Sequence, residues 1–272
     1  NFSVFDQAAD YDNPLLTEGE RLADMPLSRD WQDFPPAYTP IDFPNGIQVG
    51  IALHGLLEKL DFTQGVKGEH TAKLAQNLQL DEAWLAPMQQ WLNQVLHTPL
   101  LAHDSGLTLA CLPPHSCLKE MQFYLKLGVD FSVARFNRIL QQHRFGSGKA
   151  FLFDDIQGMV RGFIDLVFIH QNKYYLLDYK SNLLGNRRAD YAQEELTQVM
   201  ETNHYDLQYL LYILALHRYL QKRLADYHYE THFGGAIYTF LRGMNGENAD
   251  YGVFFHKPDW ALIQALEALF YA

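Results

Sequence analysis

Two apolar runs, with three polar residues between them, constrain the fold of this chain more than any other feature of its sequence. The runs cover residues 159–169 and 173–180. Apolar runs of strand length that flank a short polar connection are typical of a β-hairpin. If the turn centres between Gln171 and Asn172, the register of the two strands follows from it.

This register places two acids opposite each other within otherwise apolar strands. Asp165 and Asp178 would have Cβ atoms about 5 Å apart on one face of the sheet. Carboxylates at that distance repel each other, so either one of them is protonated or a cation lies between them. Lys180 follows Asp178 by two residues and faces the same side, because side chains alternate along a strand.

Two acids and a lysine suit the hydrolysis of a phosphodiester. Mg²⁺ prefers oxygen ligands, and a metal held by Asp165 and Asp178 can polarise a phosphate and activate water. Lys180 can orient or deprotonate that water, or stabilise the negative charge that develops on the phosphate. The alternative interpretation is a structural Asp–Lys ion pair on an edge strand.

Periodicity along the rest of the chain predicts a mixed sheet that is covered by helices. Several segments repeat apolar residues at helical spacing, and others have the pattern of strands. Strands bracketed by helices place the chain in the α/β class. Helices are predicted over residues 51–60, 81–96, 132–143, 192–200, 204–224 and 259–270, and further strands over 120–127 and 235–241.

The N-terminal part of the chain differs from the rest in composition. Residues 1–45 contain six of the eleven prolines, and residues 1–50 hold nine acids and two bases. This composition predicts a proline-rich acidic linker or wrapping arm over residues 1–45, followed by one catalytic domain over residues 46–272. The chain also begins without Met, as is expected of a piece of a longer polypeptide.

Charge and cysteine content exclude several classes of protein. A net charge of -11 argues against an independent, tightly binding nucleic-acid protein, because neutralisation of phosphates drives most such affinity. It is compatible with an enzyme that gathers carboxylates around a cation, or with one that receives its substrate from a partner. The chain has only two cysteines, Cys111 and Cys117, which excludes a disulfide scaffold and favours the reducing cytoplasm.

The hairpin motif resembles that of a known nuclease superfamily. Gly162-Phe-Ile-Asp165 followed by Asp178-Tyr179-Lys180 is similar to the PD-(D/E)xK nucleases, in the spacing of RecB-type enzymes and of their C-terminal nuclease domain in particular. The resemblance covers about residues 50–243 and implies a restriction-endonuclease-like mixed central sheet flanked by helices. Further similar runs are residues 161–168, 174–182, 205–209, 216–220 and 232–235.

The resemblance implies a metal site and a catalytic lysine. Asp165 and Asp178 resemble the metal-binding acids, and Lys180 resembles the catalytic lysine. His54 and the backbone carbonyl of Tyr179 are similar to further metal ligands of the family, although a histidine in a leucine-rich helix is by itself more often a core residue. Mg²⁺ is the implied cofactor, and Mn²⁺ is expected to substitute because imidazole is a softer ligand than Mg²⁺ favours.

Other polar residues have weaker predicted roles beside this site. Gln208 and Tyr212 resemble the family's Gln-x-x-x-Tyr motif and share one helix face. As part of that motif they are expected to orient the catalytic lysine or the scissile phosphate, whereas as bare residues they would more often be a structural pair. Glu58 and Glu120 are candidate second-tier acids.

RecB-type enzymes also imply partners and a process. The resemblance implies single-stranded DNA as the main substrate, delivered by a helicase part of RecB, together with RecC and RecD subunits. It further implies double-strand-break repair and contact with the RecA recombinase. Two alternatives stay open: a non-catalytic module of the same fold that docks partners or recombinase, and a stand-alone nuclease of the superfamily.

Overall fold

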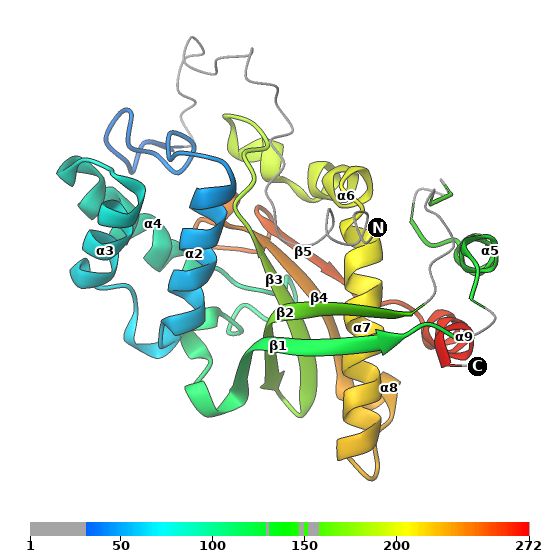
Figure 1. Ribbon diagram of the computed structural model, residues 1–272. Coiled ribbons are helices and arrows are strands. Elements are labelled where there is room, and N and C mark those ends of the chain that lie inside the picture. The colour runs from blue at the N-terminus through cyan, green and yellow to red at the C-terminus, as the bar shows by residue number, and fades with distance from the viewer. Residues whose placement is uncertain (1–30, 129–130, 147–149, 152–157, 272) are drawn as a thin grey trace.

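A five-stranded mixed sheet forms the centre of the molecule (Figure 1). The computed structural model describes residues 31–128, 131–146, 150–151 and 158–271. Strands β3 and β4 pair in parallel, and the other neighbouring pairs are antiparallel. In spatial order the strands are β1 (Cys117–Lys126), β2 (Met159–His170), β3 (Lys173–Lys180), β4 (Phe233–Phe240) and β5 (Val253–His256).

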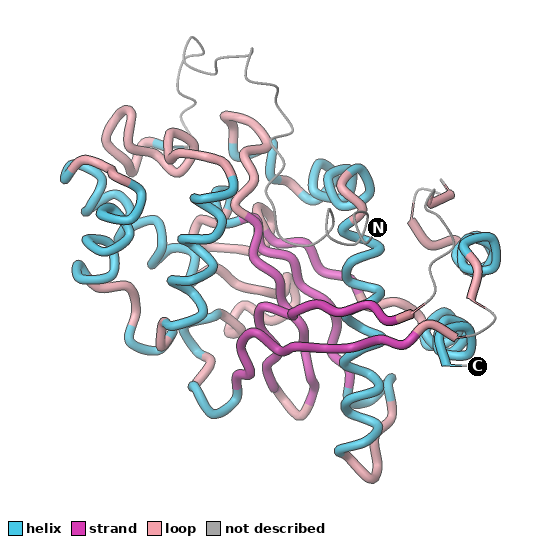
Figure 2. The backbone as a smooth tube through the Cα atoms, viewed as in Figure 1, coloured by secondary structure: helices cyan, strands magenta, loops and turns pink. Residues whose placement is uncertain are grey.

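Helices cover both faces of this sheet, which confirms the predicted α/β class (Figure 2). Each helix predicted from the sequence is present with shifted ends, whereas α3, α8 and β5 were not predicted. The apolar pattern of α3 is weak, since only Thr71, Leu74 and Ala75 are buried. The helices are α2 (Ile47–Lys59), α3 (Gly68–Leu78), α4 (Leu85–His97), α5 (Val133–Gln142), α6 (Gln193–Thr202), α7 (Tyr205–Arg223), α8 (Tyr229–His232) and α9 (Trp260–Tyr271).

Two hydrophobic cores lie on opposite faces of the sheet. On β3, Leu176 belongs to the core that contains α7 and α9, whereas Tyr175 and Leu177 belong to the core that contains α2 and α4. Helix α7 packs against the sheet, α6 and α9 and is buried around most of its circumference, as expected of an enclosed helix. Strand β3 is therefore covered on both faces.

The hairpin of β2 and β3 has the predicted register. Its turn residues Gln171 and Asn172 have φ angles of 48° and 61°, the positive values that a type I′ turn requires. The ladder extends from the turn to the pair of Leu166 and Leu177. The two acids come next along the same register, just beyond the end of the ladder.

The position of β3 corrects one part of the structural interpretation. Strand β3 is the middle strand of the sheet, so the expectation that Asp178 and Lys180 could lie on an edge strand is wrong. Both side chains are buried, with 0% and 3% of their surfaces exposed. Charged groups in a central strand need strong local compensation, which the site described below provides.

Part of the segment predicted as an arm packs onto the folded body. Trp31, Phe34 and Phe43 are buried and belong to the two cores. The buried guanidinium of Arg242 donates hydrogen bonds to the backbone of this segment. Residues 1–30 lie outside the described residues, and the predicted boundary after residue 45 stays a prediction.

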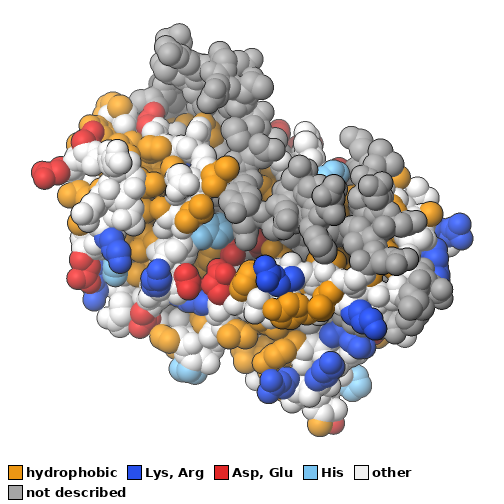
Figure 3. Space-filling view, in the orientation of Figure 1, with side chains coloured by type: hydrophobic (Ala, Val, Ile, Leu, Met, Phe, Trp, Pro, Cys, Tyr) orange, Lys and Arg blue, Asp and Glu red, His pale blue; other side chains and the backbone are white. Residues whose placement is uncertain are grey.

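The surface carries two contrasting areas on the face in Figure 3. Acidic side chains gather beside a group of hydrophobic side chains that lies over β1 and β2. Several large apolar residues of these two strands are exposed, among them Tyr124 and Met159. None of the helices in the described part of the chain is both long and apolar enough to cross a lipid bilayer.

Candidate active site

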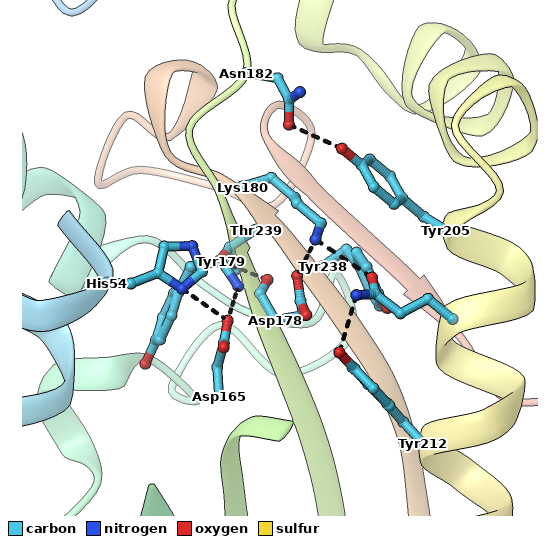
Figure 4. A network of polar contacts seen from close by, with 11 residues as sticks. His54, Asp165, Asp178, Tyr179, Lys180, Asn182, Tyr205, Tyr212, Tyr238 and Thr239 are labelled. Atoms are coloured by element: carbon cyan, nitrogen blue, oxygen red, sulfur yellow. Dashed lines mark hydrogen bonds and ion pairs between the residues drawn. The ribbon is translucent and has the colours of Figure 1, made fainter. Parts of the chain in front are cut away.

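The residues predicted to form the active site come together around the end of strand β3 (Figure 4). They are contributed by the β2–β3 hairpin and by two helices, α2 and α7, that lie far from each other in the sequence. Helix α2 contributes one residue from one face of the sheet, and α7 contributes two from the other face. The residues are His54 from α2, Asp165 from β2, Asp178, Tyr179 and Lys180 from β3, and Gln208 and Tyr212 from α7.

Asp165 links β2 to β3 and to α2. One of its carboxylate oxygens, Oδ2, accepts a hydrogen bond of 2.8 Å from the backbone N–H of Tyr179. The same oxygen lies 3.4 Å from Nδ1 of His54, and the His54 ring contacts the Tyr179 ring edge-on. Asp165 is nearly buried, so these contacts compensate for the water that its carboxylate has lost.

A lysine on β1 fixes the helix that carries His54. Lys119 Nζ donates hydrogen bonds to the carbonyl oxygens of Leu57 and Leu60, at the end of α2, where carbonyls lack helical partners. Its ammonium also lies 3.8 Å from the centre of the Phe62 ring, and burial lowers the pKa of Lys119. These contacts hold α2, and with it His54, against the strands.

Asp178 and Lys180 form a buried ion pair on the other side of the site. Lys180 Nζ lies 2.7 Å from Asp178 Oδ2, and 4.3 Å from the centre of the Tyr205 ring. The opposite charge and the face of the ring both favour the ammonium form. The arrangement agrees with the prediction that the two side chains share a face of the strand.

Gln208 holds the lysine from the α7 side. Its carbonyl oxygen Oε1 accepts hydrogen bonds from Lys180 Nζ at 3.3 Å and from the Tyr238 hydroxyl at 2.9 Å. Its amide nitrogen Nε2 donates to the Tyr212 hydroxyl at 2.9 Å. Burial, together with the charge of Asp178, raises the pKa of Tyr238 well above its usual value, so this hydroxyl stays a proton donor.

Tyr238 was missed in the sequence analysis. It lies on β4, opposite Asp178 in the parallel β3–β4 ladder, and it is fully buried. The only sequence signal is a phenol within an otherwise apolar strand over residues 235–241. That signal is weak, because tyrosine is common in strands.

Removal of the Gln208 amide should slow catalysis without weakening substrate binding to a similar extent. In Gln208→Leu, the ammonium of Lys180 loses the acceptor that sets its direction, and a displacement of about 1 Å can cost roughly 100-fold in rate. For the DNA cleavage that the hairpin motif implies, we expect kcat to fall by about 10- to 100-fold with KM nearly unchanged. Tyr212→Phe should have a smaller effect. It removes only the hydroxyl that accepts a hydrogen bond from Gln208 Nε2, and the Oε1 atom that faces Lys180 stays in place. Equal changes in kcat and KM would contradict this positioning role.

A cavity of about 670 Å³ opens in front of Asp165, between α2 and α3. Both second-tier acids, Glu58 and Glu120, line it together with His54 and Asp165. Glu120 has a φ of 50°, in the left-handed region that few residues other than glycine adopt. The turned backbone lies at the β1 position opposite Asp165, between two regular pairs of the β1–β2 ladder.

The predicted metal ligands occur in this structure as separate contacts. His54 contacts Asp165, and Asp178 contacts Lys180. Within the described ranges, no group of three or more His, Cys, Asp and Glu side chains is arranged so that it could hold a metal ion. The donor set has the right chemistry for Mg²⁺, since it consists of carboxylate oxygens, a backbone carbonyl and one imidazole. The complete ligand set stays a prediction.

Comparison with protein families identifies the superfamily. The model of the PD-(D/E)XK nuclease superfamily matches residues 35–264 of this chain. The chain belongs to this superfamily. Its match begins within the segment predicted as an arm, where Phe34 and Phe43 are buried, and its fold is the restriction-endonuclease-like sheet that the hairpin motif implied.

Curated relatives of this chain from three bacteria carry the same name. The chain is 46% identical over 268 residues to the RecBCD enzyme subunit RecB of Haemophilus influenzae, which covers 98% of this chain and 21% of the relative. It is 40% identical over 237 residues to the same subunit of Escherichia coli K12, covering 86% of the chain and 20% of the relative. For Mycobacterium tuberculosis the identity is 33% over 259 residues, with 83% and 24% covered. The chain therefore spans about a fifth of the length of the curated relatives it matches.

Proposed function

We propose that the chain hydrolyses phosphodiester bonds of DNA with Mg²⁺ as its cofactor, and that Mn²⁺ can substitute. The observation that carries this proposal is the buried Asp178–Lys180 pair, which lies beside Asp165 at the end of the central strand. A fold needs no charged pair at that position for stability, because apolar residues of similar volume stabilise a core as well or better. Membership of a nuclease superfamily supports the same chemistry.

The residues of the site have two proposed roles. Some bind the cation, and Lys180 acts on the attacking water and on the phosphate. His54, Asp165, Asp178 and the carbonyl of Tyr179 would hold the metal. A divalent cation bound there supplies charge that polarises the phosphate and makes a nearby water more acidic. Lys180 takes the proton of that water as the neutral amine, or, as the ammonium, orients the water and stabilises the negative charge that develops on the phosphate oxygens.

Gln208 and its neighbours preserve the position of the lysine during this reaction. The amide oxygen of Gln208 and the carboxylate of Asp178 contact the same ammonium from two elements. Because Tyr212 and Tyr238 hydrogen-bond to the amide from opposite ends, the amide has little freedom to rotate. The lysine is thereby preorganised for charge stabilisation rather than being reoriented in each turnover.

The proposed context is a RecBCD-type helicase–nuclease. The curated relatives are named RecBCD enzyme subunit RecB, and the chain corresponds to about a fifth of their length. We infer that it acts as the exo- and endodeoxyribonuclease part of such an assembly, in the cytoplasm, during double-strand-break repair. Its partners would be mainly single-stranded DNA, the helicase part of RecB, RecC, RecD and the RecA recombinase. The net charge of -11 supports a division in which the motors supply most of the DNA affinity.

A non-catalytic docking module is the second candidate function. The specific observation in its favour is that Asp178 and Lys180 already form a buried ion pair, which can be a purely structural element. A stand-alone nuclease would instead share the chemistry and lack the partners. Only the docking module predicts that DNA cleavage is absent altogether.

Metal dependence tests the proposal directly. The wild-type chain should degrade single-stranded DNA in Mg²⁺, and this degradation should stop when a chelator is added. In His54→Ala, the Mg²⁺ concentration that gives half of the maximal rate should rise by roughly 10- to 100-fold, the cost of weakening the support of a metal site. A titration of the cleavage rate with Mg²⁺ measures this shift.

His97→Ala is the matched control for this titration. His97 is an exposed histidine at the end of α4, and its removal should leave the Mg²⁺ requirement unchanged. Cleavage that continues in the chelator, or an equal Mg²⁺ requirement for wild type and His54→Ala, would contradict the assignment. Absence of cleavage by the wild type, alone and in its assembly, would favour the docking module.

A further inference from the structure

We propose that the outward face of strands β1 and β2 binds single-stranded DNA and guides it to the candidate active site. This inference rests on the proposed nuclease function and deepens it by assigning the surface that holds the substrate strand. We call this surface the ribbon face. It consists of Gln122, Tyr124 and Lys126 from β1 and of Met159, Arg161 and Phe163 from β2, all of which are exposed.

The strand register arranges these six residues as three rungs of a ladder. In the antiparallel β1–β2 pair, Lys126 lies opposite Met159, Tyr124 opposite Arg161, and Gln122 opposite Phe163. Because alternate residues of a strand point to the same side, the six side chains share one face. The residues between them, such as Phe123, Leu125 and Val160, point into the core.

The same register leads to the candidate active site. The positions two residues beyond Gln122 and Phe163 are Glu120 and Asp165, where the ladder is interrupted, and both line the cavity together with His54. A single DNA strand that follows the ribbon face therefore reaches the proposed catalytic residues without leaving the surface of the sheet. The spacing is short, since successive rungs on one face are about 7 Å apart.

The ribbon face exposes large apolar side chains to an unusual degree. Tyr124 is 55% exposed, Met159 50% and Phe163 39%. Exposed apolar groups that gather in one place commonly mark a binding surface. Tyr124 and Phe163 are diagonal neighbours on adjacent strands, a separation that aromatic side chains can bridge. Two adjacent bases could stack on such a pair of rings.

Positive charge accompanies these rings. Arg161 lies directly opposite Tyr124, and Lys126 lies at the outer end of the face. The six residues include two cations and no carboxylate, in a chain whose net charge is -11. Hydrophobic side chains with blue basic groups nearby are visible over β1 and β2 in Figure 3, and the red acidic groups lie at one end.

This combination fits a single strand of nucleic acid better than a duplex or an apolar protein partner. Proteins that bind single strands join aromatic platforms, on which bases stack, to cations that contact the phosphates. In a duplex the base faces are already stacked and are not available to Tyr124 and Phe163. An interface with another polypeptide would not need the rings to lead toward Asp165 and Glu120.

Binding of a fluorescein-labelled oligodeoxythymidylate to the chain, measured by fluorescence anisotropy in EDTA at low salt, tests the inference. In Tyr124→Ala and in Phe163→Ala the dissociation constant should rise by roughly 5- to 150-fold each, the cost of losing one stacked base. In Arg161→Ala the salt dependence of binding should also become weaker by about 0.7 in its logarithmic slope.

Two substitutions and a second probe separate stacking from other effects. Tyr124→Phe keeps the ring and should bind as the wild type does. Tyr219→Ala removes a tyrosine of α7 that is 38% exposed, about as much as Phe163, and this variant should also bind normally. With an abasic oligomer of the same length, Tyr124→Ala and the wild type should bind equally, because no base is present to stack.

The outcomes distinguish the ribbon face from the nuclease proposal. If the wild type binds the oligonucleotide and the ring variants bind it equally well, the inference is overturned, and the face is left as a contact surface for another polypeptide. A wild type that does not bind at low salt would overturn it too. If the ring variants lose affinity but the wild type does not cleave in Mg²⁺, the ribbon face holds and the proposed nuclease function fails.

Discussion

Replacing Asp178 by asparagine and Lys180 by methionine in the same chain should leave a folded protein that no longer cleaves DNA. The two side chains form a buried ion pair on the middle strand. The double variant removes both charges together and keeps side chains of similar size. Exchange of a buried pair for uncharged groups of similar volume is often neutral or stabilising, so the fold should survive.

The single variants should behave differently. In Asp178→Asn the Lys180 ammonium loses its carboxylate, and in Lys180→Met the Asp178 carboxylate loses its ammonium. Breaking one side of a buried pair costs about 3–5 kcal/mol of unfolding free energy. Each single variant should therefore be less stable than the double variant, a pattern that urea unfolding of the three chains measures.

Cleavage should not follow stability in this series. The proposed roles of Asp178 and Lys180 are to hold the metal and to stabilise charge on the phosphate, and loss of one such group costs about 100- to 1,000-fold in rate. The stable double variant should thus be as inactive as the less stable single variants. A structural ion pair predicts the reverse, namely activity that recovers together with the fold.

A second ion pair provides the matched control. Arg218 and Glu267 are joined at 3.1 Å between α7 and α9, away from the candidate site. Arg218→Met with Glu267→Gln should cleave DNA at the wild-type rate. Wild-type cleavage by a folded Asp178→Asn, Lys180→Met chain would refute the catalytic assignment of these two residues.

Local signals in the sequence were sufficient for the hairpin. The apolar runs of β2 and β3 are continuous and indicate two strands, and the register followed once the turn was assumed to centre between Gln171 and Asn172, as the structure confirms. Because a strand alternates its side chains, the shared face of Asp178 and Lys180 followed from the sequence as well. These features depend on residues that are close together in the chain.

Long-range contacts were not accessible in the same way. Tyr238 contacts Gln208 only because β4 pairs in parallel with β3. No local pattern in the sequence predicts which strands of the sheet are neighbours. His54 was found through the resemblance to the superfamily, since its own surroundings in the sequence suggest a core helix. Helix α3 has few apolar residues and buries only three side chains, so its sequence did not indicate a helix that packs on a core.

Arg242 makes further long-range contacts, and its removal should have a large effect on stability. The side chain is fully buried and donates four hydrogen bonds of 2.6–2.7 Å to carbonyl oxygens. One acceptor is Ser181, directly after β3, and the others are Pro40, Phe43 and Pro44 of the N-terminal segment. A single guanidinium thus joins the end of β3 to that segment.

Arg242→Met should lower the free energy of unfolding by about 3–5 kcal/mol, because it leaves buried carbonyl groups without their charged donor. Arg242→Lys should recover only part of this loss, since an ammonium cannot reproduce the planar fork that serves both sides. Denaturant unfolding measures both values. Arg218→Met is the control, and as a partly exposed partner in an ion pair it should cost less than about 1 kcal/mol.

Denaturant unfolding of Arg242→Met, combined with a deletion of residues 31–45, tests how far the folded domain extends toward the N-terminus. If residues 31–45 are an arm that can be removed, then deleting them should cost little, and Arg242→Met should matter only through Ser181. The hydrogen bonds to Pro40, Phe43 and Pro44 instead predict that the deletion destabilises the chain at least as much as Arg242→Met does. They also predict that the two changes together cost less than their sum, because they remove shared contacts. A stable deletion variant in which Arg242→Met still costs its full amount would place the boundary of the domain after residue 45.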